Sequence, residues 1–300
     1  MGKEEKIMSF YNSFKKYYVS QRVEKSFKKD KELQELLKKN AEFKDLHKGQ
    51  RCFVIGNGPS LKDEDLSALE NEVVFTVNKI ANHPQFEAMK SNYHFWADPV
   101  FFKLSPENKE DLELLESFFA VKTKDNNPIC FLPAFARDFI KNFNVEEKLD
   151  VRIYSTPLPF RDGENGDIDF TRPTFGYQTV VQFAVAMAIY MGFSEIYLLG
   201  CDSTGIIPTI QACLDQEVDG YAYDVSENEK KFLKKISENR QFGIESDFLG
   251  WATILHIHRE LYRYCTNRNI KLVNCSSKTI IDSIPRDSLA NVLKRENNDK

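Results

Sequence analysis

Apolar and polar positions alternate in blocks along most of the chain from residue 51 onward. Helical periodicity is clearest in Thr179–Met191 and Ala252–Asn267. Seven short apolar runs have the length and composition of buried strands: 52–55, Val73–Val77, Tyr93–Trp96, Ile129–Leu132, Val151–Tyr154, Glu195–Leu199 and Lys271–Asn274. Strands and helices alternating at this spacing predict a Rossmann-like α/β fold with a doubly wound, mostly parallel sheet.

Residues 1–47 depart from this alternation and predict a charged, helical extension. Phe10, Phe14, Tyr17 and Tyr18 are spaced to form one apolar face among lysines. One interpretation is a surface helix that contacts an anionic membrane or a partner. The interpretation we favour is a helix packed on its own domain or on the neighbouring subunit of a homo-oligomer, because any surface helix is amphipathic.

A second departure covers residues 203–250, which contain few clear strands and a lysine-rich stretch at 227–240. Insertions over the carboxyl edge of a sheet often close binding sites, so this segment predicts a lid. We therefore expect one α/β domain over 48–293 and a disordered tail over 294–300.

The composition limits the classes of protein to which this chain can belong. The 300 residues are 42% hydrophobic and carry a net charge of -4, which argues against a dedicated nucleic-acid binder. The six cysteines lie far apart without a C-x-x-C pair, and neither a signal peptide nor a membrane-spanning apolar run is visible. These features predict a reduced, cytoplasmic protein, at the inner face of the membrane if the extension binds there.

The first apolar run ends in the turn Gly56-Asn57-Gly58-Pro59-Ser60. Gly and Asn tolerate left-handed backbone angles and Pro fixes its own, so a tight turn follows. Ser60 is predicted to cap a helix whose first turn holds the acidic residues 63–65. Backbone N–H groups would then face a phosphate or a nucleotide sugar at the carboxyl edge of the sheet. A plain strand-to-helix turn is the alternative.

Two common phosphate-binding motifs are absent from this turn. A dinucleotide fingerprint needs a third glycine where Leu61 stands, and the Gly-Lys-Ser/Thr of a P-loop is missing. NAD enzymes and P-loop kinases therefore become less favoured interpretations.

Polar residues also follow four other predicted strands: Asn78, Asp98, Asp202 and Ser276. Open α/β sheets bind ligands in the crevice outside the carboxyl ends of their strands. Each residue alone could equally cap a helix or fix a turn. Their recurrence at four strand ends favours one shared site.

Taken in order, these segments resemble the DUF115/MptE-like proteins and the related bacterial sialyltransferases of glycosyltransferase family 42. The resemblance extends over roughly residues 45–293 and is carried by Gly-Asn-Gly-Pro-Ser-Leu-Lys, Val-Asn-Lys, Asp-Pro-Val-Phe-Phe, Met-Gly-Phe-Ser-Glu-Ile-Tyr-Leu-Leu-Gly-Cys-Asp and Gly-Tyr-Ala-Tyr-Asp. It implies one sialyltransferase-like, GT-A-variant domain with a lid, a CMP-sugar donor substrate and no metal cofactor. The MptE branch implies instead a Mg-dependent pyrophosphokinase acting on 6-hydroxymethyl-dihydropterin.

The resemblance also assigns roles to individual residues. Asn57 and its neighbours Gly56, Gly58 and Ser60 match the segment that holds the donor phosphate and ribose. Asn78 matches a second asparagine that faces the nucleotide, and Thr179 lies near a Ser/Thr pair beside the donor.

Two further matches concern the lid and the third strand end. Tyr221 matches a lid tyrosine that hydrogen-bonds the departing phosphate. Asp98 stands where the sialyltransferases have asparagine, so an amide has become a carboxylate.

The general-base histidine of the sialyltransferases is missing, since the matching stretch Gly243–Gly250 contains none. Glu245 or Asp247 could substitute, because a carboxylate can accept a proton from a sugar hydroxyl. His256 and His258 come later, and their i, i+2 spacing on a helix points them to different faces.

Metal binding depends on which branch applies. Asp167-Ile168-Asp169 has the D-x-D form of metal-dependent glycosyltransferases, but it lies in an acidic loop and we interpret it as coincidence. Mg²⁺ on Asp98 or Asp202 would suit the pyrophosphokinase.

Our first hypothesis is a glycosyltransferase that moves a sugar, such as a sialic-acid-like one, from a CMP-type donor to a glycan acceptor in surface polysaccharide synthesis. The alternatives are the pterin pyrophosphokinase and a non-catalytic nucleotide-sugar-binding protein. No nucleic-acid partner is expected.

Overall fold

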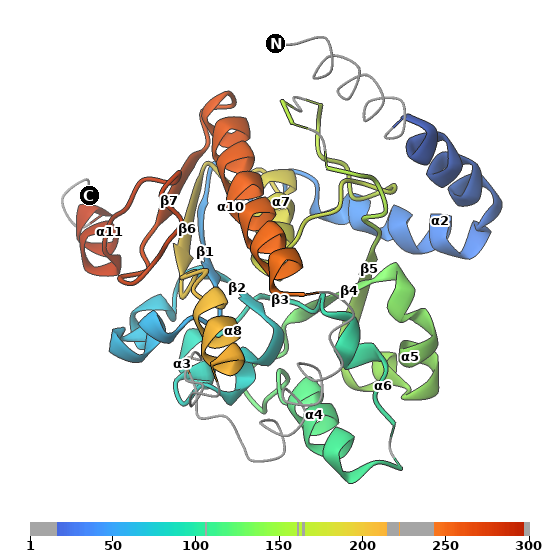
Figure 1. Cartoon of the computed structure of the whole chain (residues 1–300), viewed down its shortest axis with the longest axis horizontal. Helices are drawn as coiled ribbons and strands as arrows, with labels where there is room; N and C mark the ends of the chain where they lie inside the picture. The colour runs from blue at the N-terminus through green and yellow to red at the C-terminus, as the bar shows by residue number, and fades with distance from the viewer. Residues whose placement is uncertain are drawn as a thin grey trace.

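One seven-stranded, all-parallel sheet forms the centre of the molecule, in the order β5-β4-β3-β2-β1-β6-β7 (Figure 1). The computed structural model describes residues 17–105, 107–160, 162–163, 166–214, 222 and 243–296. The strands are β1 Arg51–Ile55, β2 Val73–Val77, β3 Tyr93–Phe95, β4 Ile129–Pro133, β5 Asp150–Tyr154, β6 Glu195–Leu199 and β7 Lys271–Asn274. All seven predicted strands are confirmed, and every neighbouring pair is parallel rather than most of them.

The strand order places a topological switch at β1. Strands β2 to β5 follow one another outward on one side of β1, whereas β6 and β7 lie on its other side. The chain connections after β1 and β6 therefore leave in opposite directions, and such a switch point is where open α/β sheets usually bind ligands.

Helices cover both faces of the sheet, as the predicted double winding requires (Figure 1). The α-helices are α2 Lys31–Lys38, α3 Phe86–Met89, α4 Lys109–Phe119, α5 Arg137–Asn142, α6 Val145–Lys148, α7 Val180–Tyr190, α8 Ile206–Cys213, α10 Ile244–Thr266 and α11 Leu289–Glu296. The 3-10 helices are η1 Lys39–Phe43, η2 Pro59–Asp63, η3 Leu66–Leu69, η4 Asn78–Asn82, η5 Pro99–Phe102 and η6 Ala134–Ala136. Residues 17–29 are helical as well.

The strands are apolar throughout because both faces of the sheet are covered. In β1, Cys52 and Val54 join the cluster that contains α7 and α10, whereas Phe53 and Ile55 join the cluster on the other face. All four side chains are fully buried. An uninterrupted apolar run therefore folds as a strand here.

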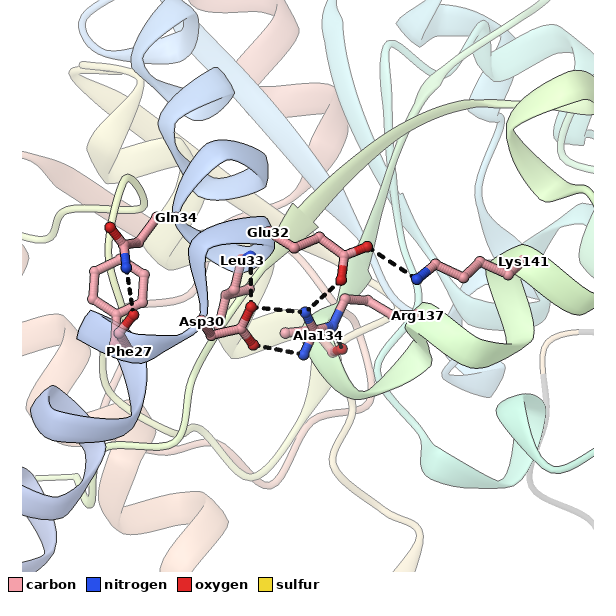
Figure 2. A network of polar contacts seen from close by, with 8 residues as sticks. All are labelled: Phe27, Asp30, Glu32, Leu33, Gln34, Ala134, Arg137 and Lys141. Atoms are coloured by element: carbon pink, nitrogen blue, oxygen red, sulfur yellow. Dashed lines mark hydrogen bonds and ion pairs between the residues drawn. The ribbon is translucent and has the colours of Figure 1, made fainter.

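The predicted extension is held against the sheet domain by charged side chains (Figure 2). Arg137 at the start of α5 donates to both carboxylate oxygens of Asp30, at 2.9 and 3.3 Å, and to Glu32. Lys141 pairs with Glu32 at 3.0 Å. The hydrogen bond from Arg137 lowers the pKa of Asp30, which also caps α2 by accepting the Leu33 N–H.

Behind this charged contact, the segment from α2 to residue 47 buries one side against the domain. Leu37 and Phe43 are almost fully buried. The amide of Asn40 donates to the carbonyl of Ile153 in β5 at 2.7 Å and to that of Phe170 at 2.9 Å. From Asp30 onward, the extension thus packs on its own domain.

The first helical residues differ from this buried part. Tyr17 and Tyr18 are exposed, and Phe10 and Phe14 lie outside the described residues. A membrane contact through this face stays a prediction. Among the helices of the described residues, none is both long enough and apolar enough to cross a membrane.

The predicted lid at 203–250 is described in three parts: α8, Ala222 and the first turns of α10. Residues 215–221 and 223–242 lie outside the described part of the chain. At the C-terminus, α11 runs to Glu296 into the predicted tail, and residues 297–300 are not described.

Candidate functional site

The turn after β1 packs directly on the turn after β6 at the carboxyl edge. The N–H of Gly56 donates to the Leu199 carbonyl and that of Gly58 to the Gly200 carbonyl, both at 2.8 Å. A Cβ added to Gly56 would lie 2.3 Å from the Gly200 oxygen, and one added to Gly58 would lie 2.5 Å from Cγ of Asp202. Both glycines are therefore needed for this close approach, whatever their contribution to ligand binding.

Ser60 and Asp202 join the two turns through their side chains. The backbone N–H of Ser60 donates to Asp202 Oδ2 at 2.8 Å, and its hydroxyl donates to Oδ1. The prediction that Ser60 caps a helix is wrong. Gly58 occupies the cap position without a side-chain hydrogen bond, and the five residues of η2 follow instead of an α-helix. The buried carboxylate of Asp202 takes the hydroxyl that would otherwise cap, so there is no α-helix N-terminus here to bind phosphate.

The side chain of Asp202 is buried, with 1% of its surface exposed. Burial raises its pKa, because a charged group loses hydration there, whereas the two hydrogen bonds from Ser60 oppose the rise. The net shift is upward. Asp202 thus links the β1 and β6 turns at the topological switch.

Two asparagine side chains at neighbouring strand ends have buried oxygens with no hydrogen-bond partner in the described part of the chain. The amide nitrogen of Asn57 donates to the Val77 carbonyl at 3.1 Å, which fixes its Oδ1 as the atom left over. Asn78, with φ 48°, has a buried Oδ1 in the same condition. A carbonyl oxygen only accepts hydrogen bonds, and leaving one unpaired in the interior is costly. These two positions therefore suit a ligand that carries hydroxyl or amino hydrogens.

Strands β2 and β3 also share a buried polar contact that the sequence does not reveal. His94 in β3 shares a hydrogen bond of 2.8 Å with the hydroxyl of Thr76 in β2, and burial lowers its pKa to about 3. The ring is therefore neutral, and it packs beside Trp96. His94 and Thr76 each lie within a predicted strand. An apolar run of residues gives no sign that two strands will share a polar contact.

Three predicted site residues make local structural contacts. Asp98 is exposed and caps η5 by accepting a backbone N–H at 3.0 Å. Thr179 is the N-cap residue of α7, and its N–H donates to Gln182 Oε1 at 3.3 Å. The hydroxyl of Ser276 is buried and accepts the Cys201 N–H at 2.8 Å, which supports the β6 turn from below. Their roles in nucleotide binding stay predictions.

The predicted lid reaches the asparagine turn at one described residue. The N–H of Ala222 donates to the Asn57 carbonyl at 3.1 Å, and its side chain is buried. Tyr221, the predicted lid tyrosine, lies outside the described residues. Its covalent neighbour is therefore in direct contact with the site.

The two candidate bases lie in the first turn of α10, the helix that follows the lid. Glu245 is exposed, whereas Asp247 is half-buried with Oδ2 shielded from solvent. The start of α10 lies close to the loop after β6, because the ring of Trp251 would be 2.7 Å from a Cβ at Gly205. Which of the two acts as a base stays a prediction.

No described residues form a group of three or more His, Cys, Asp or Glu side chains placed to hold a metal. In the D-x-D sequence, Asp169 accepts the N–H and hydroxyl of Thr171, and the exposed Asp167 lies 3.6 Å from Arg268. Burial lowers the pKa of His258 to about 4, which makes it a neutral core residue.

Comparison with known proteins identifies one family model. Residues 26–204 match the model described as 6-hydroxymethylpterin diphosphokinase MptE-like. No curated protein matches significantly.

Two solved structures are similar to this chain. The sialyltransferase CstII from Campylobacter jejuni, in complex with a substrate analogue, cytidine-5′-monophosphate, is 21% identical over 80% of this chain and 85% of its own, with a TM-score of 0.43. MAf glycosyltransferase from Magnetospirillum magneticum AMB-1 is 13% identical over 89% of this chain, with a TM-score of 0.44. This chain covers 41% of that second protein.

Proposed function

The chain belongs to the MptE-like family, and we propose that it is a glycosyltransferase that moves a sugar from a CMP-type donor to a glycan acceptor. The observation that carries the proposal is the pair of buried, unpartnered amide oxygens of Asn57 and Asn78 among the described residues. Ribose hydroxyls and the amino group of cytosine supply the hydrogens that these oxygens lack. The strand-end motifs shared with the sialyltransferases support the CMP-type donor, and a role in surface polysaccharide synthesis follows from the same resemblance.

In the proposed reaction, an acceptor hydroxyl oxygen bonds to the anomeric carbon of the sugar while the bond from that carbon to the phosphate oxygen breaks. The electron pair of the broken bond leaves with the nucleoside monophosphate. The hydroxyl proton passes to a carboxylate of the protein. Tyr221 donates a hydrogen bond to the phosphate as its charge grows.

Asp247 is the better candidate for this carboxylate. Residues two apart on a helix point to different faces, so Glu245 and Asp247 cannot both face the site. Glu245 is exposed, whereas Asp247 turns one oxygen away from solvent. The oxygen of Asp247 that solvent does not reach is therefore the one we assign to accept the hydroxyl proton.

The family description makes a Mg-dependent pterin pyrophosphokinase the second candidate. That reaction needs carboxylate oxygens for Mg²⁺ at the phosphates. Both oxygens of Asp202 accept hydrogen bonds from Ser60, and one oxygen of Asp98 caps η5. These engagements favour the metal-independent transfer.

A thermal-shift panel of CMP, CDP, UDP, GDP and ATP, each with and without Mg²⁺, separates the candidates. A ligand at about 100 times its Kd adds roughly 2.7 kcal/mol of stability. Stabilisation by CMP or CDP without metal is the expected result. Stabilisation by ATP alone, and only with Mg²⁺, would replace the proposal with the pyrophosphokinase.

Matched variants then test the assigned atoms. Asn57→Ala should abolish the response to CMP, whereas Asn71→Ala, an exposed asparagine at the opposite edge, should leave it intact. In turnover of CMP-activated sugars, Asp247→Asn should slow transfer by about 10²–10⁴-fold without loss of CMP binding, and Glu245→Gln should behave as the unmodified protein. If Glu245→Gln slows transfer and Asp247→Asn does not, Glu245 is the base. If the protein binds CMP but transfers no sugar, it is a non-catalytic nucleotide-sugar-binding protein.

A further inference from the structure

A cavity of about 330 Å³ lies between α10 and the loop that leads from β5 into α7. Its walls include Phe160, Asp162, Tyr177, Gln178, Thr253 and His256. None of these residues belongs to the predicted strand-end site, although Gln178 directly precedes Thr179. The volume falls at the lower end of the range of about 300–1,000 Å³ that is usual for small-molecule sites.

The loop wall of this cavity is closed by backbone hydrogen bonds. The N–H of Leu158 donates to the Thr174 carbonyl at 3.2 Å, and the N–H of Gly176 donates back to the Leu158 carbonyl at 2.7 Å. A Cβ at Gly176 would lie 3.1 Å from the Thr156 oxygen, so the two arms of the loop approach closely. The hollow is therefore framed by a fixed backbone.

The helix wall is fixed to the acidic loop at successive turns of α10. Residues four apart lie above one another on a helix, and three residues at this spacing each hold one loop residue. The contacts are His256 Nε2 with Asp162 Oδ1 at 2.7 Å, Glu260 Oε2 with the Gly163 N–H at 2.8 Å, and the Tyr264 hydroxyl with the Gly166 carbonyl at 2.9 Å.

His256 is a fixed polar wall of the cavity rather than the missing general base. Arg259 donates to its Nδ1 at 2.7 Å, so the ring proton is on Nε2 and points to Asp162. Both ring nitrogens are thus engaged. Asp162 keeps a second carboxylate oxygen with which it can accept a ligand hydroxyl.

The cavity lies at the same end of the sheet as the strand-end site. α7 packs across β1, β2 and β3, and its first turn meets α10 where Gln182 Nε2 donates to the Ile254 carbonyl at 2.9 Å. α7 and α10 therefore lie side by side (Figure 1), and Gln178 in the lining of the cavity lies two residues before the start of α7. A substrate in this hollow would approach the nucleotide site from beside Thr179.

The lining of the cavity combines apolar rings with polar side chains. The rings of Phe160 and Tyr177 offer apolar surface, and Asp162, Gln178 and Thr253 offer donors and acceptors. A sugar ring likewise has apolar C–H faces and a rim of hydroxyls. We propose that this cavity binds a sugar unit of the glycan acceptor. The inference rests on the proposed function and adds to it the site of the second substrate.

The test is ligand-observed NMR on the full chain, with the methyl glycosides of glucose, galactose and N-acetylglucosamine as probes. At least one probe should show saturation transfer without nucleotide. Thr253→Trp places a ring into the cavity from an exposed helix position and should remove the signal. Ala252→Trp, the adjacent exposed position outside the lining, is the matched control and should retain it. Gln178→Ala, which loses one hydrogen bond, should weaken binding about tenfold.

The outcomes separate this inference from the proposed function. No signal with any glycoside, or an undiminished signal in Thr253→Trp, overturns the sugar subsite even if CMP still stabilises the protein. A glycoside signal that Thr253→Trp removes supports the subsite even if no nucleotide binds. Asn57→Ala should leave glycoside binding unchanged, because it acts on the other site.

Discussion

The two edges of the sheet differ in how their polar groups are satisfied. At the amino edge, a larger hollow of about 450 Å³ is lined by charged groups that pair with one another. Arg51 donates to both oxygens of Glu72, and Lys271 donates to Glu195 and to the Tyr197 hydroxyl, each at 2.8 Å. At the carboxyl edge, the buried oxygens of two asparagines have no partner in the described residues. The charged groups around the larger hollow are therefore satisfied by one another, whereas the two asparagine oxygens are not.

The carboxylates of the two edges also differ in the direction of their pKa shifts. At the carboxyl edge, burial raises the pKa of Asp202 despite the hydrogen bonds from Ser60. At the amino edge, burial raises the pKa of Glu195 in the first place, but hydrogen bonds from Lys271 and Tyr197 turn the net shift downward. The charge of Glu195 at the amino edge thus stabilises the folded protein, whereas the charge of Asp202 at the carboxyl edge destabilises it.

The largest expected effect comes from the glycine contact at the carboxyl edge. Gly56→Ala would push a methyl group to 2.3 Å from a backbone oxygen, and we expect the free energy of unfolding to fall by about 3 kcal/mol. Gly250→Ala, inside α10 with nothing within 4 Å of its added Cβ, is the control and should stabilise by up to about 1 kcal/mol. Urea denaturation measures both. Equal effects would mean that the β1 and β6 turns are not in close contact.

A smaller effect should separate stability from binding at the amino edge. Glu72→Gln removes the charge partner of the mostly buried Arg51 and should lower the free energy of unfolding by about 1–3 kcal/mol. Nucleotide binding, measured by calorimetry, should remain unchanged. Glu70→Gln, which breaks the exposed pair with Lys90, should change neither quantity. Loss of CMP binding in Glu72→Gln would place the nucleotide at the amino edge and reverse the comparison.

The smallest effect concerns the pH dependence of stability. A raised folded-state pKa disfavours folding as pH rises through it, so the unmodified protein loses stability relative to Asp202→Asn as pH rises above about 4, the ordinary pKa of an aspartate. For Glu195 the sign is opposite. Its lowered pKa stabilises the fold above the unfolded value and is lost as pH falls, so Glu195→Gln should cost most at pH 7.

Denaturation curves at several pH values check both signs. The stability difference of Asp202→Asn from the unmodified protein should become more favourable as pH rises, and that of Glu195→Gln should become less favourable. Ser60→Ala removes a hydrogen bond that lowers the pKa of Asp202. It should therefore make the loss of stability caused by Asp202 with rising pH steeper. Parallel trends in Asp202→Asn and Glu195→Gln would contradict the electrostatic difference between the edges.

Most of the fold could be predicted because its signals are local. Each strand is an apolar run bounded by turn residues, and the run Glu195–Leu199 matches β6 residue for residue. The region after β1 is where the prediction failed. Ser60 has the residue type and the position of a helix cap, yet its hydroxyl bonds a carboxylate 142 positions away.

The sequence predicts which residues stand at the strand ends, and their roles in ligand binding stay predictions. Asn57 and Asn78 were found because they follow apolar runs, and the structure adds which of their atoms lack a partner. The interpretation of Gly56 and Gly58 as phosphate-facing glycines did not anticipate that the β6 turn packs against them. The cavity beside α10 had no sequence signal, because it is formed by a loop and a helix about a hundred positions apart.

The sequence by itself therefore determined the seven strands, their burial and the polar character of their ends, since hydrophobic periodicity and turn residues act over neighbouring positions. The tertiary structure alone decided which of those polar groups pair with each other and which have no partner among the described residues. A hydrogen bond depends on the position of its partner to within a few tenths of an ångström. Partners far apart in the chain acquire that position only when the sheet has assembled.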